Sequence, residues 1–213
     1  MDFDEFLRLS SKIENIPLTA EISHLKMVPP FRKDLLELQT EAIKNAKKAG
    51  VLALFYPDET NQTKFVLILR KTYEGIHSAQ VSFPGGKFEK QDVSLKDAAI
   101  RETFEEIGVP INDIDVLFEL SQVYIPPSNF YVYPFIAVTK RIPVFCLQAY
   151  EVEAVIEVNL KDFLSDAVLI TAQIKTSYSM EVDVPAFQLN GFIVWGATAM
   201  ILSEIKDMLK QLI

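Results

Sequence analysis

The chain has 213 residues, of which 49% are hydrophobic, enough apolar material for one sizeable core. Its 29 acidic and 21 basic residues give a net charge of -8, which argues against binding to nucleic acid or to an anionic membrane surface. A single cysteine excludes an intrachain disulfide framework, the N-terminus is too charged for a signal peptide, and no stretch reaches the roughly 18 apolar residues of a membrane span. We therefore expect a soluble, cytoplasmic protein.

The N-terminal part of the chain is expected to be helical. Residues 3–15 and 32–48 have the apolar spacing of helices, and Gly50 follows as a stop signal. No linker or internal repeat divides the rest of the chain. These features predict a helical extension, residues 1–49, packed on one domain of residues 50–213.

The domain itself reads as a mixture of strands and helices. Residues 51–57 and 64–70 are aliphatic runs that flank a polar turn, which predicts a β-hairpin. Helical periodicity returns from about Gly191 to the end of the chain. Further strands are predicted over residues 116–125, 131–140, 154–160, 168–176 and 180–189. This order predicts an α/β (α+β) fold with a mixed sheet between helices.

One internal helix lies between the hairpin and the later strands. Ser94 followed by Asp97 resembles a capping box, which places the helix start near Ser94. The Gly108-Val109-Pro110 sequence gives a C-terminal stop. The helix is therefore predicted over residues 95–107.

Three glutamates share one side of this helix. Glu102, Glu105 and Glu106 fall on an arc roughly 100° wide, where like charges repel one another. Hard oxygen ligands gathered in this way suit Mg²⁺ or Mn²⁺, which keep several waters and bridge to phosphate. Upstream, Gly85-Gly86 lets the backbone approach a ligand closely. Loop and helix together predict a site for a metal and a phosphate, although an acidic helix face is more often simply solvated.

The spacing of these residues matches a family signature. The stretch resembles the Nudix box, whose pattern is Gly, five residues, Glu, seven residues, Arg-Glu, an aliphatic residue, any residue, Glu-Glu, any residue, Gly and an aliphatic residue. Two positions depart from it, because Asp92 replaces the first glutamate with eight residues following, and Thr103 replaces the aliphatic residue. The matching positions are Gly86, Arg101-Glu102, Glu105-Glu106 and Gly108-Val109.

The segment before the box resembles the coenzyme A pyrophosphatase branch of the family. There an aliphatic run, an arginine and a Phe-Pro pair lead into the glycines, and Arg70 and Phe83-Pro84-Gly85-Gly86 are in register. That branch carries a box one residue longer and a small residue after Arg-Glu, so both departures favour it. Gly75 stands where the branch prefers an arginine. The likeness runs from about residue 51 to residue 203.

The resemblance implies roles for individual residues. It implies that Glu102, Glu105 and Glu106 hold one or more Mg²⁺ or Mn²⁺ ions, and that Glu102 or a carboxylate outside the box is the base. Arg101 would orient the glutamates. The substrate would contact Arg70, Gly85 and Gly86, and an extra base would come from Glu151 or Glu153.

Arg70 has two readings. It can hold a substrate phosphate, or it can end a strand and pair with a nearby acid such as Glu74. Aromatic residues have alternatives too, since Phe130, Tyr131 and Tyr133 can stack on an adenine or face the sheet core. Trp195 is predicted to be a core residue of the final helix.

The implied function is hydrolysis of a pyrophosphate linkage in a nucleoside diphosphate derivative, with coenzyme A or an acyl derivative first. The alternatives are another Nudix substrate, such as ADP-ribose or a dinucleotide, and a non-catalytic nucleotide sensor. The presence of all three box glutamates favours a hydrolase over a sensor. The mean hydropathy of +0.17 is high for a monomer and predicts a homodimer.

Overall fold

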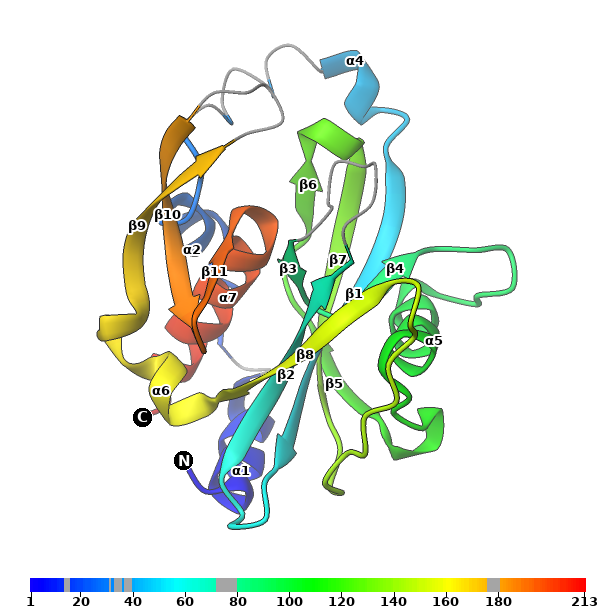
Figure 1. Cartoon of the computed structure of the whole chain (residues 1–213), viewed down its shortest axis with the longest axis vertical. Helices are drawn as coiled ribbons and strands as arrows, with labels where there is room; N and C mark the ends of the chain where they lie inside the picture. Colours follow the sequence, from blue (N-terminus) through cyan, green and yellow to red (C-terminus); the bar gives the residue numbers. More distant parts are fainter. Residues whose placement is uncertain (14–15, 31, 33–35, 37–39, 72–79, 176–180) are drawn as a thin grey trace.

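A mixed β-sheet with helices on both faces forms the body of the protein (Figure 1). The computed structural model describes residues 1–13, 16–30, 32, 36, 40–71, 80–175 and 181–213. The predicted fold class, a mixed sheet between helices preceded by an N-terminal helix, is confirmed.

The centre of the sheet is the predicted hairpin. β1 (Lys47–Pro57) pairs antiparallel with β2 (Thr63–Arg70) and parallel with β7 (Phe130–Val138), so the sheet is mixed. The remaining strands extend it from these three. β3 (Val81–Ser82) and β8 (Val152–Asn159) pair with β2, β4 (Gly85–Lys87) pairs with β1, and β5 (Asp115–Glu119) and β6 (Val123–Ile125) pair with β7.

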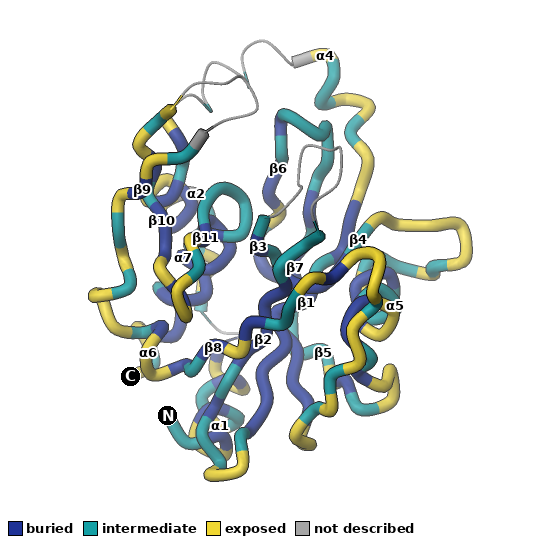
Figure 2. Tube along the Cα trace, viewed as in Figure 1, coloured by how far each residue is buried: buried dark blue, intermediate teal, exposed yellow. Residues whose placement is uncertain are grey.

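Alternate residues of the strands face two different helical layers. Leu52 and Leu54 of β1 belong to a core cluster that includes α5 (Leu95–Ile107). Ala53 and Phe55 belong to a second cluster, which includes α1 (Phe3–Ile13) and α7 (Gly196–Lys210). Figure 2 shows the buried centre of the sheet between these layers. The period of two along β1 thus produces the three-layer arrangement.

A second sheet lies beside α7. β9 (Leu169–Lys175), β10 (Glu181–Leu189) and β11 (Phe192–Trp195) pair antiparallel, after the short helices α6 (Leu160–Leu164) and η3 (Asp166–Val168). The helix predicted from Gly191 is therefore wrong at its start. Asn190 and Gly191 both have positive φ, which makes the two-residue turn that an Asn-Gly pair favours in a hairpin. Trp195 lies on β11 and is partly exposed, so its assignment to the core of a helix is also wrong.

The structure describes the two predicted N-terminal helices only in part. The helix predicted over 3–15 is α1, described to Ile13, and α2 (Ala20–Leu25) follows. The helix predicted over 32–48 lies partly outside the described residues, contains α4 (Thr40–Ile43), and gives way to β1 at Lys47. The division into an extension of 1–49 and a domain of 50–213 stays a prediction.

Gly50 has a role other than a helix stop. It lies inside β1, where a Cβ would collide with the carbonyl oxygen of Leu95 and lie 3.1 Å from the backbone nitrogen of Ala99. The absence of a side chain therefore lets α5 pack closely on the sheet.

One predicted strand, 116–125, is divided in two. β5 and β6 both pair with β7, and residues 120–122 between them are not in a strand, although the N–H of Leu120 still donates to the carbonyl of Pro134 on β7 at 2.8 Å. Here the backbone N–H of Ser121 donates to Glu204 Oε2 at 3.2 Å, and its hydroxyl donates to Oε1 at 2.6 Å. Glu204 is fully buried on α7 and also contacts His24 Nε2 of α2 at 3.2 Å. A buried carboxylate needs such hydrogen-bond partners. Through them Glu204 links both α2 and the segment between β5 and β6 to α7. Short turns of helix at η1 (Ile111–Asp113) and η2 (Pro126–Ser128) flank these strands.

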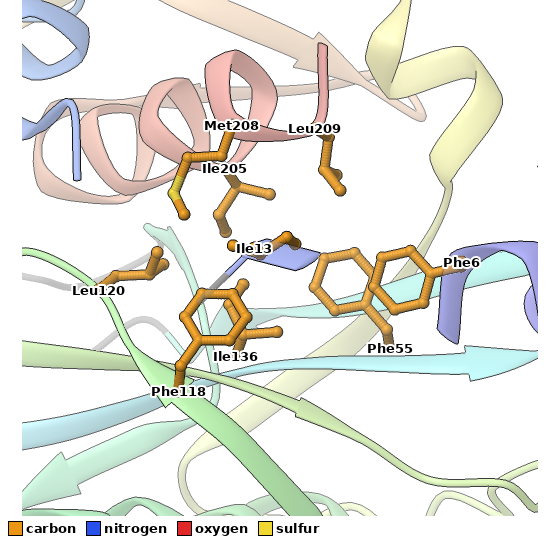
Figure 3. A pocket seen from close by; sticks show the side chains of 9 residues that line it. All are labelled: Phe6, Ile13, Phe55, Phe118, Leu120, Ile136, Ile205, Met208 and Leu209. Carbon is orange, nitrogen blue, oxygen red and sulfur yellow. The ribbon is translucent and has the colours of Figure 1, made fainter. Parts of the chain in front are cut away.

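The layer between α1, the sheet and α7 contains a small cavity of about 10 Å³ (Figure 3). Its walls are apolar, and they are formed by Phe6, Ile13, Phe55, Phe118, Leu120, Ile136, Ile205, Met208 and Leu209. A water in a protein needs two or more polar partners, which this lining does not offer. The cavity is a packing defect of the core and not a site for a nucleotide.

Within the described residues, the helices are all too short or too polar to span a bilayer.

Candidate active site

α5 carries the glutamates, and local signals fix where it starts and ends. The Ser94 hydroxyl accepts a hydrogen bond from the Asp97 backbone N–H at 3.2 Å and donates to the Asp97 carboxylate at 2.8 Å. At the other end Gly108 is left-handed, with φ 75°, and its N–H donates to the carbonyl of Phe104 at 2.8 Å. The predicted helix 95–107 is confirmed, and its capping fixes the direction of each glutamate.

The three glutamates differ in their exposure. Glu106 is 1% exposed, whereas the side chains of Glu102 and Glu105 are 15% and 49% exposed. The helix therefore presents a graded series of carboxylates from the sheet to solvent. The sequence spacing places the three glutamates on one face, but it does not show that Glu106 is buried and Glu105 exposed.

Glu106 is held between two elements of the sheet. Its Oε1 accepts from Arg70 Nη1 at 3.0 Å, and its Oε2 accepts from the backbone N–H of Gly85 at 2.8 Å. Arg70 ends β2, and Gly85 begins β4. The structure thus brings together two residues that the sequence assigned to substrate and one that it assigned to metal.

Arg101 is the centre of a carboxylate network. Its Nε and Nη2 donate to the two oxygens of Asp92 at 2.8 and 3.1 Å, a bidentate contact. Its Nη1 donates to Glu102 and to Glu105, each at 3.0 Å. The geometry agrees with the predicted orienting role of Arg101, and Asp92 in place of the first box glutamate is its anchor. The contact with Arg101 lowers the pKa of Asp92.

The two glycines of the loop allow close backbone contact. A Cβ on Gly86 would lie 2.6 Å from either carboxylate oxygen of Glu102. Gly85 has φ 141°, and a Cβ there would lie 2.5 Å from Val51 Cα of β1 and collide with the carbonyl of Gly50. Gly86 therefore leaves room for the Glu102 carboxylate, while Gly85 is required by the backbone itself.

Burial and mutual repulsion raise the proton affinity of the inner carboxylates. Burial raises the pKa of Glu106 to about 7, and the carboxylates of Glu102 and Glu151 add to the rise. Arg70 and the N–H of Gly85 oppose it. Burial also raises the pKa of Glu102, with smaller contributions from Glu105 and Glu151, while Arg101 lowers it. The site holds more negative charge than its arginines neutralise, a condition that a bound cation would relieve.

The two candidates for an extra base separate in the structure. Glu151 precedes β8, lies 3.9 Å from Arg70 Nη2, and is close enough to Glu102 and Glu106 to raise both of their pKa values. Glu153 is exposed and lies 3.9 Å from Lys71 Nζ. Of the two, Glu151 is the one that joins the site.

Sequence reasoning missed several contributors to this site. The backbone N–H groups of Cys146 and Gln148 donate to the last carbonyls of α5, those of Ile107 and Glu106, both at 2.9 Å. This loop caps the helix and leads directly to Glu151. No local pattern marks these residues, because their partners are distant in the sequence.

The aromatic candidates and the suggested acid partner of Arg70 do not extend the described site. Glu74 lies outside the described residues, as does His77, one of the chain's two histidines, and the other, His24, contacts Glu204 of α7. The aromatic candidates have neighbours of their own: Tyr131 packs against Tyr124, Lys47 lies over Phe130 and Lys48 over Tyr133.

The residues present fit a hard divalent cation. The side-chain oxygens that Glu102, Glu105, Glu106 and Glu151 offer as metal ligands are carboxylate oxygens, the type that Mg²⁺ and Mn²⁺ prefer. Within the described residues no three such side chains converge tightly enough to cage a metal. Mg²⁺ does not need a cage, since it commonly takes one or two carboxylates together with water and substrate phosphate. Two oxygens that would bind it, one on Glu106 and one on Glu102, are at present paired with arginines.

Comparisons with known proteins agree with this geometry. The model of the NUDIX domain matches residues 46–174. The peroxisomal coenzyme A diphosphatase ndx-8 of Caenorhabditis elegans is 30% identical over 169 residues, which cover 78% of this chain and 70% of that protein. An uncharacterized Nudix hydrolase NudL of Enterobacter sp. (strain 638) is 29% identical over 76% of this chain and 82% of that protein.

Solved structures show the same fold. The Nudix hydrolase RenU of M. smegmatis superimposes with a TM-score of 0.54 over 78% of this chain and 87% of its own, at 15% identity. The chain belongs to the Nudix family. It is a pyrophosphohydrolase that acts on small nucleotide derivatives, and such hydrolases generally require a divalent cation.

The raised pKa of Glu106 predicts how stability depends on pH when no metal is present. The folded value is about 7 and the ordinary value is 4.5, so between them the folded state binds more protons and its stability falls as pH rises. The stabilising contribution of protonating Glu106 to the free energy of unfolding is at most about 3 kcal/mol. It is fully present below pH 4.5 and is lost above about pH 7. Urea unfolding in EDTA at pH 5 and pH 8 should show a larger loss for the wild type than for Glu106→Gln. Parallel losses would show that Glu106 titrates normally.

Proposed function

We propose that the protein hydrolyses the pyrophosphate linkage of coenzyme A or an acyl derivative, releasing 4′-phosphopantetheine, or its acyl form, and adenosine 3′,5′-bisphosphate. The observation that carries the proposal is the buried Glu106, placed by Arg70 and Gly85 beside Glu102 and Glu151. The choice of substrate is supported by the similarity to a coenzyme A diphosphatase over most of the chain. It is also supported by the likeness of the segment from Arg70 to Gly86 to that branch.

The side chains have separate tasks in this proposal. Glu102, Glu105 and Glu106 would hold Mg²⁺ or Mn²⁺, and such an ion would supply polarisation of a pyrophosphate oxygen and a lower pKa for a bound water. Arg101, anchored on Asp92, keeps Glu102 and Glu105 in position. Gly85 and Gly86 line the approach of the pyrophosphate without a side chain in the way.

The base that accepts the proton of the attacking water is Glu102 or Glu151. Both lie near Glu106, and both remain partly exposed, so a water can reach either carboxylate. A raised pKa brings Glu102 closer to the range in which a carboxylate is an effective base at neutral pH. Either carboxylate, acting as the general base, is compatible with in-line attack of a water on phosphorus.

Arg70 is proposed to contact a substrate phosphate, and the 3′-phosphate of coenzyme A is the distinguishing one. Such a charge-assisted contact is worth about 1.5 to 3 kcal/mol, or about tenfold to a hundredfold in binding. Dephospho-coenzyme A should therefore be a poorer substrate. Because Gly75 replaces an arginine of the branch, the preference should be at the small end of this range.

Product analysis tests the substrate. Purified protein is incubated with Mg²⁺ or Mn²⁺ and with coenzyme A, dephospho-coenzyme A or ADP-ribose, and the products are measured by mass spectrometry. We expect both halves of coenzyme A, with slower cleavage of dephospho-coenzyme A. Brisk cleavage of ADP-ribose with coenzyme A intact would refute the substrate and leave the pyrophosphohydrolase in place.

The cytoplasmic location and the homodimer stay predictions. One relative is described as peroxisomal, and Nudix hydrolase 15 of Arabidopsis thaliana, 32% identical over 56% of this chain and 42% of its own length, as mitochondrial. Those labels belong to the relatives.

A further inference from the structure

Both carboxylate oxygens of Glu106 accept hydrogen bonds from protein groups. Arg70 Nη1 lies 3.0 Å from Oε1, and the N–H of Gly85 lies 2.8 Å from Oε2. The Glu106 side chain is 2% exposed, so water contributes little to its solvation. Arg70 is thus a built-in counter-ion of the buried carboxylate.

A divalent cation on Glu106 would meet this counter-ion. A metal bound to Oε1 of Glu106 would lie about 2.0–2.2 Å from that oxygen, and therefore at most about 5 Å from Arg70 Nη1, which is 3.0 Å from Oε1. Two positive charges at that separation repel strongly in a partly buried site. The metal and the guanidinium therefore compete for one buried negative charge.

Arg70 has a second carboxylate within reach on the solvent side. Its Nη2 lies 3.9 Å from Glu151, whose side chain is half exposed, and the Arg70 side chain itself is 23% exposed. The guanidinium has flexible methylene groups and can turn from Glu106 toward Glu151 without a change in the strand. That movement takes the guanidinium from a buried carboxylate to one that is half exposed, and so toward solvent.

We propose that Arg70 occupies the place of the metal on Glu106 and that binding of the divalent cation displaces it toward Glu151 and the substrate phosphate. This inference rests on the proposed metal site at Glu106. It makes Arg70 a positioning residue whose availability to phosphate depends on the metal. The metal-free enzyme then keeps both its buried carboxylate and its arginine paired.

Binding of Mn²⁺ alone, measured by calorimetry and by electron paramagnetic resonance, tests the exchange without turnover. In Arg70→Gln the competitor is gone, so the affinity for Mn²⁺ should rise about tenfold to a hundredfold, the range of one charge-assisted contact. Lys71→Gln is the matched control, because it removes the same charge one residue away and Lys71 pairs with Glu153. Its affinity should stay within about twofold of the wild type.

The opposite results overturn the proposal. Weaker or unchanged Mn²⁺ binding in Arg70→Gln would mean that Arg70 supports the metal-bound state as well. Equal tightening in Lys71→Gln would mean that only the net charge matters. Wild-type affinity in Glu106→Gln would overturn the metal site itself, which is a separate failure.

Thermal melting gives a second readout, made without titration or turnover. In EDTA the Arg70→Gln protein should melt below the wild type, because Glu106 has lost its counter-ion. Added Mn²⁺ should raise its melting temperature by more than it raises that of the wild type. If Arg70→Gln does not fold, Arg70→Lys, which keeps the charge but not the fork, should bind Mn²⁺ a few-fold more tightly; no tightening would count against the exchange.

Discussion

Glu106→Gln should lower turnover by about three orders of magnitude or more while the protein stays folded. The amide keeps an oxygen that can accept from the N–H of Gly85, but it lacks the negative charge that is proposed to bind the metal. Glutamine has nearly the helix propensity of glutamate, and a neutral group is easier to bury at a position that is 1% exposed. Steady-state kinetics with saturating Mg²⁺ and far-UV circular dichroism measure the two effects.

Glu89→Gln is the matched control for that substitution. Glu89 is an exposed carboxylate before the helix, and the described contact of its side chain is with Gln91 at 3.2 Å. Its replacement removes the same charge and should leave turnover within about twofold of the wild type. Comparable activity of the two variants would remove Glu106 from the metal site.

Gly86→Ala should cost about a hundredfold in turnover or more, with little loss of stability. The new methyl group would lie 2.6 Å from both oxygens of Glu102, so this carboxylate must move away. The backbone of Gly86 is not left-handed, and the displaced atoms are the end of a flexible side chain. We therefore expect a cost in stability of about 1 kcal/mol or less, measured by urea unfolding.

Two further variants show whether the loss passes through Glu102. In a Glu102→Gln background, where that carboxylate is already lost, Gly86→Ala should have little additional effect on turnover. Gly85→Ala should instead destabilise the protein, because φ is 141° and the methyl group would meet the backbone of β1. Full activity of Gly86→Ala would show that the position of Glu102 matters little.

Local signals determined the parts of the structure that the sequence predicted well. The hairpin around residues 58–63, the helix 95–107 and its two ends depend on neighbours a few residues apart. The shared face of Glu102, Glu105 and Glu106 depends only on the helix period, but their assignment to a metal site came from the resemblance to the Nudix box.

Contacts between distant residues decided the rest. Residues 47–48 follow a helical pattern, yet the parallel pairing of β1 with β7 makes them strand. Phe192–Trp195 lie in an apolar run that suits a helix, and the hairpin with β10 makes them strand. Short apolar segments fit either structure, and the available partner determines which forms.

The site shows the same division. The resemblance to the Nudix family predicted separate roles for Glu106, as a metal ligand, and for Arg70, as a substrate contact, but their pairing across 36 positions depends on how α5 packs on the sheet. The choice of Glu151 over Glu153 likewise depends on the loop that caps α5. The sequence by itself determined which residue types stand at which spacing, because these follow from the helix period and the turns. Only the tertiary structure decided which of them are buried and paired, because burial and ion pairs are made by elements that are distant along the chain.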